Sequence, residues 1–253
     1  VFATSHGTVR RNNLSDFKNI RANGMIAMKL DEGESLISVK TCSNDDDLIL
    51  STRNGKAIRF AVEGLRVFKS RASTGIRGIK LTDGDEVVSI SIVKNTPLTP
   101  EEKSAYLKNA AKLRGQDDDE SSEDILSGDN LSLTQERFEE LASKEDFLLV
   151  TTSKGFGKRT SAYEYRETNR GGSGIWNVKL NNKNGKVVST FKVIDSDELM
   201  LVTDGGQVIR MPVKDIRFAG RQTQGVTLFR IAEGEEVVSA AVISDNDEDG
   251  DEE

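Results

Sequence analysis

The sequence predicts an all-β fold made of four repeats of a propeller-type array, with one helical insertion and an acidic end. Two observations support this prediction. Equivalent glycines recur 51 residues apart, from Gly24 to Gly75 and again from Gly174 to Gly225. Short apolar runs separated by Gly-containing turns surround each of them, and a period near 50 residues is typical of arrays of small antiparallel sheets. The 99 residues from Gly75 to Gly174 therefore contain an insertion of about 48 residues.

The second repeat shows the expected strands most clearly. Residues 47–52 form an apolar run, Gly55 follows Asn in a hairpin-turn dipeptide, and residues 56–60 alternate polar and apolar side chains. Residues 75–81 are expected as a third strand of the same sheet, and residues 86–93 as its last strand. The fourth repeat copies this order, so each repeat is predicted to be a four-stranded antiparallel blade.

The insertion differs in pattern from the repeats. Thr99 precedes Pro and two Glu residues, which is a helix-capping signature, and we expect a helix of about 15 residues ending at Arg114. A second short helix is expected over 133–144. Residues 116–129 are acidic and Ser-rich, a composition typical of disorder.

These patterns divide the chain into six segments. The blades are expected at 1–45, 46–93, 146–194 and 195–244, the insertion at 94–145 and the acidic tail at 245–253. Because the sequence opens inside a strand-like run, we expect it to be a C-terminal fragment of a longer protein. Such a fragment is expected to be less stable than its parent, since an uncapped array exposes a strand edge.

The net charge of −7 conceals a basic body. The insertion 94–145 carries 13 acidic and 7 basic side chains, and the tail 245–253 carries seven acidic and no basic ones. The four repeats are therefore left with a net charge of +6. A basic body beside acidic segments favours a polyanionic partner that the average charge would not suggest.

Three basic positions recur in all four repeats. The first row follows a turn glycine by four residues, the second precedes the recurring glycine by three or four, and the third follows it by five. The first row is Arg11, Arg59, Arg159 and Arg210; the second is Arg21, Arg71, Arg170 and Arg221; the third is Lys29, Lys80, Lys179 and Arg230. Arg10, Arg77 and Lys158 add neighbouring cations.

Rows of Lys and Arg match the phosphates of a duplex, so contact with a nucleic-acid backbone is the favoured interpretation. Each row also has an alternative. The first row could be solvated strand ends, and the third a charged outer strand face. The arginines of the second row could lock their loops by donating to carbonyls of the neighbouring blade.

Other chemistry finds little support. Cys42 and His6 have no nucleophile–base pattern around them, and the acidic turns lack the ligand spacing of a calcium loop. No apolar run approaches the length of a membrane span, and a single Cys fits a reducing cytosol. Trp176 is expected in the core of a blade rather than as a platform for a base. We therefore expect no catalytic residues, metal or cofactor in this chain.

The repeats resemble the C-terminal domain of DNA gyrase A, a pinwheel-shaped variant of the β-propeller. The segments that carry the resemblance are FATSHGTVRR (2–11), STGIRGI (73–79), GFGKRT (155–160) and GRQTQGV (220–226). The acidic end resembles that family's tail, and the order of repeats is similar to the last four of six blades. The family's heptapeptide QRRGGKG is absent, and NRGGSG (169–174) is a degenerate echo of it.

The resemblance implies a bacterial, cytoplasmic domain that binds and wraps double-stranded DNA, bending it along a basic rim so that supercoiling is directional. It implies as partners the rest of gyrase A and the gyrase B protein, in a heterotetramer that is an ATP-hydrolysing topoisomerase, an isomerase. ATP and Mg²⁺ would be used by other regions of that enzyme. The alternatives are the equivalent domain of topoisomerase IV and a protein-interaction propeller without DNA binding, which predicts exposed apolar patches.

Overall fold

The computed structural model describes residues 1–20, 22–115 and 133–244. Arg21, the acidic segment 116–129 and the tail 245–253 lie outside the described residues, so the predictions made for them are not addressed. Within the described residues the strands form four antiparallel sheets, accompanied by two α-helices. The predicted all-β class with a helical insertion is confirmed.

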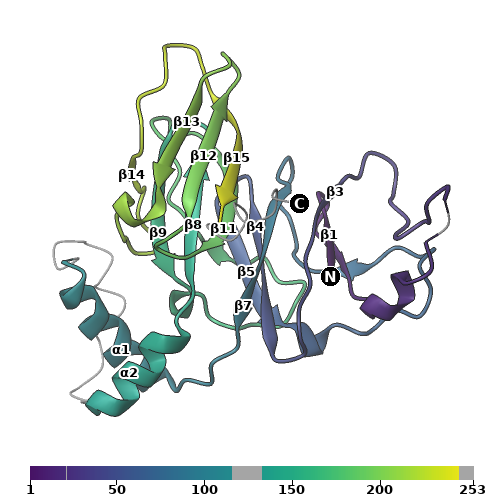
Figure 1. Cartoon of the computed structure of the whole chain (residues 1–253), viewed down its shortest axis with the longest axis horizontal. Helices are drawn as coiled ribbons and strands as arrows, with labels where there is room; N and C mark the ends of the chain where they lie inside the picture. Colours follow the sequence, from purple (N-terminus) through teal and green to yellow (C-terminus); the bar gives the residue numbers. More distant parts are fainter. Residues whose placement is uncertain (21, 116–132, 245–253) are drawn as a thin grey trace, which may run out of the picture. The chain divides into compact units, whose positions relative to one another are not determined.

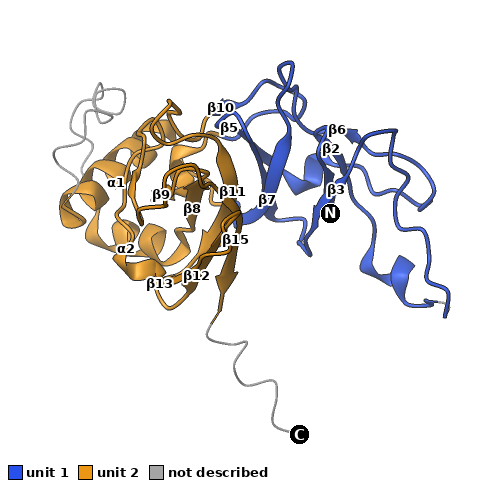
Figure 2. Cartoon of the chain, turned by 90° about the horizontal axis from the view of Figure 1, so that it is seen from above, with its two compact units in different colours: residues 1–95, 167–175 blue, residues 96–166, 176–253 orange. Residues whose placement is uncertain are grey.

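The chain separates into two compact units, coloured in Figure 2. Unit 1 consists of residues 1–95 and 167–175, and unit 2 of residues 96–166 and 176–253. Each unit contains two of the sheets, and Figure 1 shows the course of the chain through them. The units are described separately below.

Unit 1 contains the sheets of the first two repeats. The first sheet has the order β3-β1-β2-β6, with β1 at Phe2–Thr4, β2 at Thr8–Arg10, β3 at Leu36–Val39 and β6 at Ile76–Arg77. The second has the order β10-β5-β4-β7, with β4 at Asp46–Thr52, β5 at Lys56–Ala61, β7 at Val87–Lys94 and β10 at Ile175–Trp176, whose second residue, Trp176, is assigned to unit 2. The alternating face of these strands builds an apolar core that includes Leu50, Ile58 and Val87. Burial of each such side chain contributes about 1.5–3 kcal/mol.

Unit 2 contains the sheets of the last two repeats. One has the order β11-β8-β9-β14, with β8 at Phe147–Thr152, β9 at Phe156–Ser161, β11 at Val187–Val193 and β14 at Val226–Thr227. The other has the order β13-β12-β15, with β12 at Glu198–Thr203, β13 at Val208–Pro212 and β15 at Val237–Ile243. Leu149, Leu199, Leu201 and Val237 are buried together in the core of this unit.

In each four-stranded sheet one of the two edge strands, β6, β10 or β14, comes from the following repeat, and is called the exchanged strand below. β6 belongs to the second repeat by sequence but pairs with β2 of the first, where Val9 faces Ile76. β14 of the fourth repeat pairs in the same way with β9 of the third, where Gly157 faces Val226. The prediction that residues 75–81 form a strand of their own sheet was therefore wrong. Only two residues of that run are β-strand, and they complete the sheet of the preceding repeat.

The recurring glycines explain this exchange. A Cβ built on Gly75 would lie 2.1 Å from the carbonyl oxygen of Val9, and one built on Gly174 would lie 2.5 Å from that of Ala57. A Cβ on Gly225 would lie 2.7 Å from the oxygen of Gly157. At each site the chain must approach the backbone of the preceding repeat more closely than any side chain allows. The period seen in the sequence is therefore the period of strand exchange.

The insertion forms a helical hairpin within unit 2, visible in Figure 1 as α1 and α2. α1 spans Pro100–Leu113 and begins with a capping box between Thr99 and Glu102, as predicted; α2 spans Gln135–Lys144. Tyr106, Leu141 and Tyr163 share a buried cluster, which attaches the hairpin to the short 3₁₀ helix at Ala162–Glu164. Among the described helices, none has the length and apolar character needed to cross a membrane.

Candidate nucleic-acid interface

The third row of cations is exposed throughout, as predicted, but the expectation that it lies within strands was wrong, because all four residues lie outside the described strands. Lys29, Lys80, Lys179 and Arg230 all present their side chains to solvent. Three of them are anchored through the backbone to the loop of the next repeat. The N–H groups of Lys29, Lys80 and Lys179 donate to the carbonyls of Ser73, Gly172 and Thr223 at 3.3, 2.8 and 3.0 Å. At these three positions the backbone is therefore fixed by a hydrogen bond, while the ammonium group of the side chain is exposed to solvent.

At two positions of the second row, the arginine donates to a backbone carbonyl of the neighbouring repeat, which was the alternative to phosphate contact. In unit 1 the Arg170 guanidinium donates to the carbonyl of Arg77 at 3.1 Å, and in unit 2 the Arg221 guanidinium donates to the carbonyl of Trp176. Both acceptors are the second residue of an exchanged strand. Arg71 lies against the sulfur of Met25 instead. Arg170 and Arg221 hold their loops against the strand of the preceding repeat, and Arg170 remains exposed.

The first row is mostly covered. The side chains of Arg59 and Arg159 are 7% and 5% exposed, whereas that of Arg210 is 54% exposed. The Arg59 guanidinium donates to Asp47 at 2.7 Å and to the carbonyl of Lys94 at 3.2 Å. Arg159 donates to the carbonyls of Ile216 and Lys214, and its guanidinium lies 3.8 Å from the ring centroid of Phe218. Burial lowers the pKa of Arg159.

The cover comes from the following repeat. Bridges join Arg11 to Val67, Arg59 to Glu167 and Arg159 to Phe218, so the next repeat passes directly over each arginine. Arg210 belongs to the last repeat and pairs with Glu198 at the surface. The covered members of this row are structural residues. Recurrence indicates that these arginines share a role, but the sequence alone does not reveal whether their side chains contact a partner or the next repeat.

Arg10 and Lys158 occupy the equivalent position on β2 and β9, and both are completely buried. The Lys158 ammonium donates to the carbonyls of Gly220, Arg221 and Thr223, at 2.6, 2.7 and 3.3 Å. Arg10 likewise donates to the carbonyls of Arg71 and Ser73. The assignment of Arg10, Lys158, Arg59 and Arg159 to a phosphate-facing surface is therefore not supported, because their charged groups already bind backbone oxygens inside the fold.

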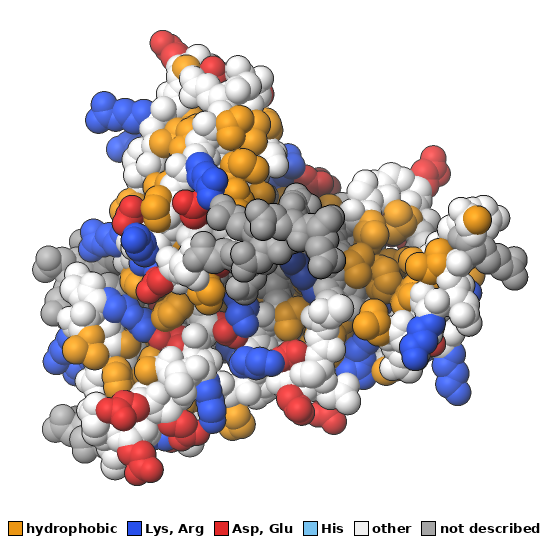
Figure 3. Space-filling model, viewed as in Figure 1, with side chains coloured by type: hydrophobic (Ala, Val, Ile, Leu, Met, Phe, Trp, Pro, Cys, Tyr) orange, Lys and Arg blue, Asp and Glu red, His pale blue; other side chains and the backbone are white. Residues whose placement is uncertain are grey.

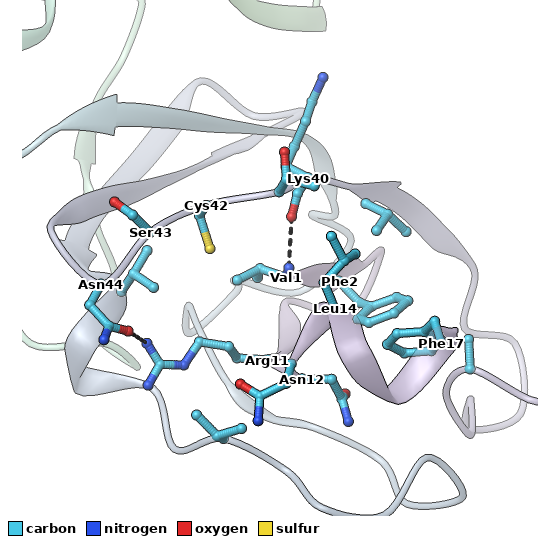
Figure 4. A pocket seen from close by; sticks show the side chains of 16 residues that line it. Val1, Phe2, Arg11, Asn12, Leu14, Phe17, Lys40, Cys42, Ser43 and Asn44 are labelled. Carbon is cyan, nitrogen blue, oxygen red and sulfur yellow. Dashed lines mark hydrogen bonds between the residues drawn. The ribbon is translucent and has the colours of Figure 1, made fainter. Parts of the chain in front are cut away.

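Arg11 points toward a hollow rather than outward (Figure 4). It lines a cavity of about 410 Å³ in unit 1 together with Phe2, Leu14 and Phe17, and its guanidinium donates to the Asn44 side chain at 3.0 Å. The Val1 ammonium donates to the carbonyl of Lys40 at the rim, and burial lowers its pKa. The lining is largely apolar and contains no carboxylate, so it does not suggest acid–base chemistry.

Of the predicted cations, those exposed in the structure are Lys29, Arg77, Lys80, Arg170, Lys179, Arg210 and Arg230. On the face shown in Figure 3, Lys and Arg side chains lie among Asp and Glu side chains and do not form one continuous field. Sequence reasoning misjudged Trp176, whose side chain is 46% exposed rather than part of a blade core. Its equivalence to Arg77, which also follows the recurring glycine by two residues, was the signal that could have indicated this.

The chain matches a family model described as the DNA gyrase C-terminal domain, beta-propeller. The match covers residues 1–43, 46–94, 146–194 and 197–244. The chain belongs to this family. The resemblance inferred from the sequence is thereby confirmed, and with it the propeller-type repeat of the fold.

Curated relatives carry the same family name. The DNA gyrase A protein of Granulibacter bethesdensis is 47% identical over 270 residues, which cover 99% of this chain and 29% of that protein. That of Rickettsia bellii is 46% identical, covering 100% and 28%, and that of Mycolicibacterium smegmatis 33% identical, covering 98% and 24%. The chain thus spans less than a third of the length of these gyrase relatives.

Solved structures support the fold. The C-terminal domain of DNA topoisomerase IV aligns with a TM-score of 0.70 at 19% identity, covering 96% of this chain and 61% of that one. The DNA gyrase A C-terminal domain aligns with a TM-score of 0.67 at 21% identity, covering 95% and 64%. The two structural scores are similar, so the relation to gyrase rests on the sequence matches.

Proposed function

We propose that this chain is a DNA-binding and DNA-wrapping domain of a gyrase A protein. One observation carries the proposal: every repeat places an exposed cation of the third row at the same point, five residues after the recurring glycine. Cations that recur once in every repeat favour backbone contacts over reading of base sequence. Specificity would then come from DNA deformability.

The fixed backbone at Lys80 and Lys179 also supports phosphate contact. Only the side chain has to be ordered on binding, because the main chain is already hydrogen-bonded to the neighbouring loop. Arg77 and Arg170 lie beside Lys80, since the Arg170 guanidinium bonds to the carbonyl of Arg77 and the loop that follows receives the N–H of Lys80. This junction in unit 1 groups three cations.

In the longer protein, the domain would bend DNA so that strand passage by the rest of gyrase A and by gyrase B becomes directional. The chain would supply geometry, while ATP hydrolysis and Mg²⁺ belong to other regions. Among the described residues, no group of three His, Cys, Asp or Glu side chains could hold a metal ion. We place the enzyme in the bacterial cytoplasm.

The test is a titration of a duplex of about 40 base pairs against this chain at several salt concentrations. Affinity is expected to fall steeply with salt, and each of Lys80→Ala, Lys179→Ala and Arg230→Ala should reduce the salt slope by about 1. Lys144→Ala on α2, where the lysine pairs with Glu140, is the matched control and should leave the slope unchanged. Absence of binding at low salt would reject the proposal.

Protein binding is a second candidate, favoured by one observation. Leu36 and Val39 in the first repeat are 43% and 50% exposed, whereas their equivalents Val87 and Ile90 are buried. An exposed apolar face of this kind is typical of an interface. This function would gain support only if the DNA titration fails.

A further inference from the structure

We infer that Trp176 is a DNA contact, with its indole packed against the sugars and base edges of a duplex beside the cations of the third row. The inference rests on the proposed DNA-binding function and adds to it an apolar element. It starts from the equivalence of exchanged strands. Arg77 on β6, Trp176 on β10 and Thr227 on β14 each precede a third-row cation by three residues, and all three are exposed.

The position therefore belongs to the same outward surface as the cations. If Lys179 contacts a phosphate chain, the side chain three residues before it lies within reach of the same duplex. In the second repeat, Arg77 is suited to that place by its charge. The equivalent residue in the third repeat is Trp176, a large aromatic side chain that is 46% exposed.

The ring is not needed for the core. The two residues that follow it fill the interior instead, since Asn177 is completely buried and Val178 is 1% exposed. Asn177 accepts from the Tyr165 hydroxyl at 2.5 Å and donates to the Thr190 hydroxyl at 3.1 Å. The backbone is thus fixed on the inner side of the strand, which leaves the indole on the outer side.

Hydrogen bonds fix the backbone at Trp176. The carbonyl of Trp176 accepts from the Arg221 guanidinium, and the loop that carries Arg221 is held by the buried Lys158 ammonium. The N–H of Arg221 donates to the Glu164 carboxylate at 2.7 Å. A rigid aromatic side chain loses little conformational entropy on binding, which is the property that makes Trp an efficient contact residue.

The chemistry of the ring fits a duplex. Apolar side chains beside the minor groove pack against sugars or press between base steps, and so help to bend DNA toward the major groove. Lys179 follows Trp176 by three residues and the Arg221 guanidinium donates to the Trp176 carbonyl, so both supply positive charge near this position.

Because the chain contains one Trp, its fluorescence reports on this site alone. The experiment titrates the chain with duplex DNA at low salt and follows indole emission, while the anisotropy of a labelled duplex measures binding independently. On saturation we expect emission to shift to shorter wavelength and quenching by acrylamide to fall by about twofold or more, as a stacked or covered ring requires.

Substitutions test the inference by a second measurement, the affinity for duplex DNA and its salt dependence. Trp176→Ala should weaken duplex binding by about five- to tenfold without changing the salt slope, because no counterion release is lost. Lys179→Ala should lower the slope by about 1, and Trp176→Phe should retain affinity within about twofold. Melting curves of each variant check the fold, and Val208→Ala, at an apolar side chain 63% exposed on β13, controls for loss of surface area.

Three outcomes would overturn the inference. If anisotropy reports binding while emission, acrylamide quenching and the affinity of Trp176→Ala stay unchanged, Trp176 is not a contact and the proposed function survives. If anisotropy reports no binding at low salt, the proposed function fails and this inference with it. Stronger quenching by a single strand than by a duplex at equal salt would also contradict it, because the ring would then stack on unpaired bases.

Discussion

The Lys158 ammonium and the carbonyl oxygen of Gly220 lie 2.6 Å apart, although 62 residues separate them in the chain. The lysine is on β9 of the third repeat, and the carbonyl belongs to the loop that leads into the exchanged strand of the fourth. Arg10 makes the same connection from the first repeat to the second, through the carbonyls of Arg71 and Ser73. Buried cations therefore join successive repeats at the point of strand exchange.

Lys158→Met is expected to reduce the free energy of unfolding by about 2–3 kcal/mol, because buried loop carbonyls lose their donor. The measurement is urea unfolding followed by far-UV circular dichroism. Lys179→Met is the matched control, since Lys179 is an exposed lysine of the same repeat, and it should change stability by less than about 0.5 kcal/mol. Equal stability of the two variants would show that Lys158 does not hold the loop.

Arg59→Met should cost about 3 kcal/mol or more, whereas Arg210→Met should cost less than about 1 kcal/mol. The two arginines are equivalent in sequence, and each pairs with a carboxylate 12 residues earlier, Asp47 and Glu198. The two pairs differ in burial. The side chains of Arg59 and Asp47 are 7% and 0% exposed. Those of Arg210 and Glu198 are 54% and 30% exposed. Removing one partner of the buried pair leaves an uncompensated charge inside the protein.

A double-mutant cycle checks this difference. The coupling free energy of Arg59 with Asp47 should exceed that of Arg210 with Glu198, and added salt should weaken only the second pair. Similar couplings for the two pairs would mean that the strand crossing over Arg59 does not shield it.

The repeat itself could be read from the sequence, because periodic glycines and alternating strands are local signals. Strand exchange could not, since Ile76 has the same apolar character whether it pairs within its own blade or with Val9 of the preceding one. What decides the pairing is the contact between Gly75 and the Val9 backbone, which is long-range. The 14-residue helix α1 was predictable because its capping box, Thr99 with Glu102, and Pro100 at its first position are local signals.

The candidate interface was predicted in part. The third row was expected on the outer face of a strand; Lys80 and Lys179 are exposed as expected, but they lie three residues beyond the ends of β6 and β10. The burial of Arg59 and Arg159 depends on the repeat that follows them, which composition and spacing do not reveal. Contact of any of these cations with DNA stays a prediction.

The stability contributed by Asp46 should depend on pH in the acid range. Burial alone would raise the pKa of Asp46, but the Ser43 N–H and the Lys94 ammonium donate to its carboxylate at 2.7 and 2.9 Å and bring the pKa below its usual value. A carboxyl with a lowered folded pKa stabilises the fold above its unfolded pKa of about 3.9, and this contribution is lost as pH falls through the folded value.

Asp46→Asn should therefore cost about 1 kcal/mol at pH 7 and progressively less below about pH 4. Unfolding by urea from pH 7 to pH 2.5 measures the difference from the parent chain. Asp83→Asn, in an exposed turn of the second repeat, should show no such trend. A penalty for Asp46→Asn that stayed constant across this range would mean that ionisation of Asp46 does not contribute.

Gly75→Ala should destabilise unit 1 and weaken the pairing of β6 with β2. The added methyl group would lie 2.1 Å from the carbonyl oxygen of Val9, so the exchanged strand must move away from the sheet it completes. Loss of its backbone hydrogen bonds should cost about 2–4 kcal/mol, and hydrogen exchange at Val9 and Ile76 should accelerate. Gly64→Ala is the matched control in the same repeat, because nothing lies within 4 Å of a Cβ built there. It should leave stability within about 0.5 kcal/mol. If the two alanine variants have the same melting temperature, close approach to the Val9 backbone is not the reason for glycine at position 75.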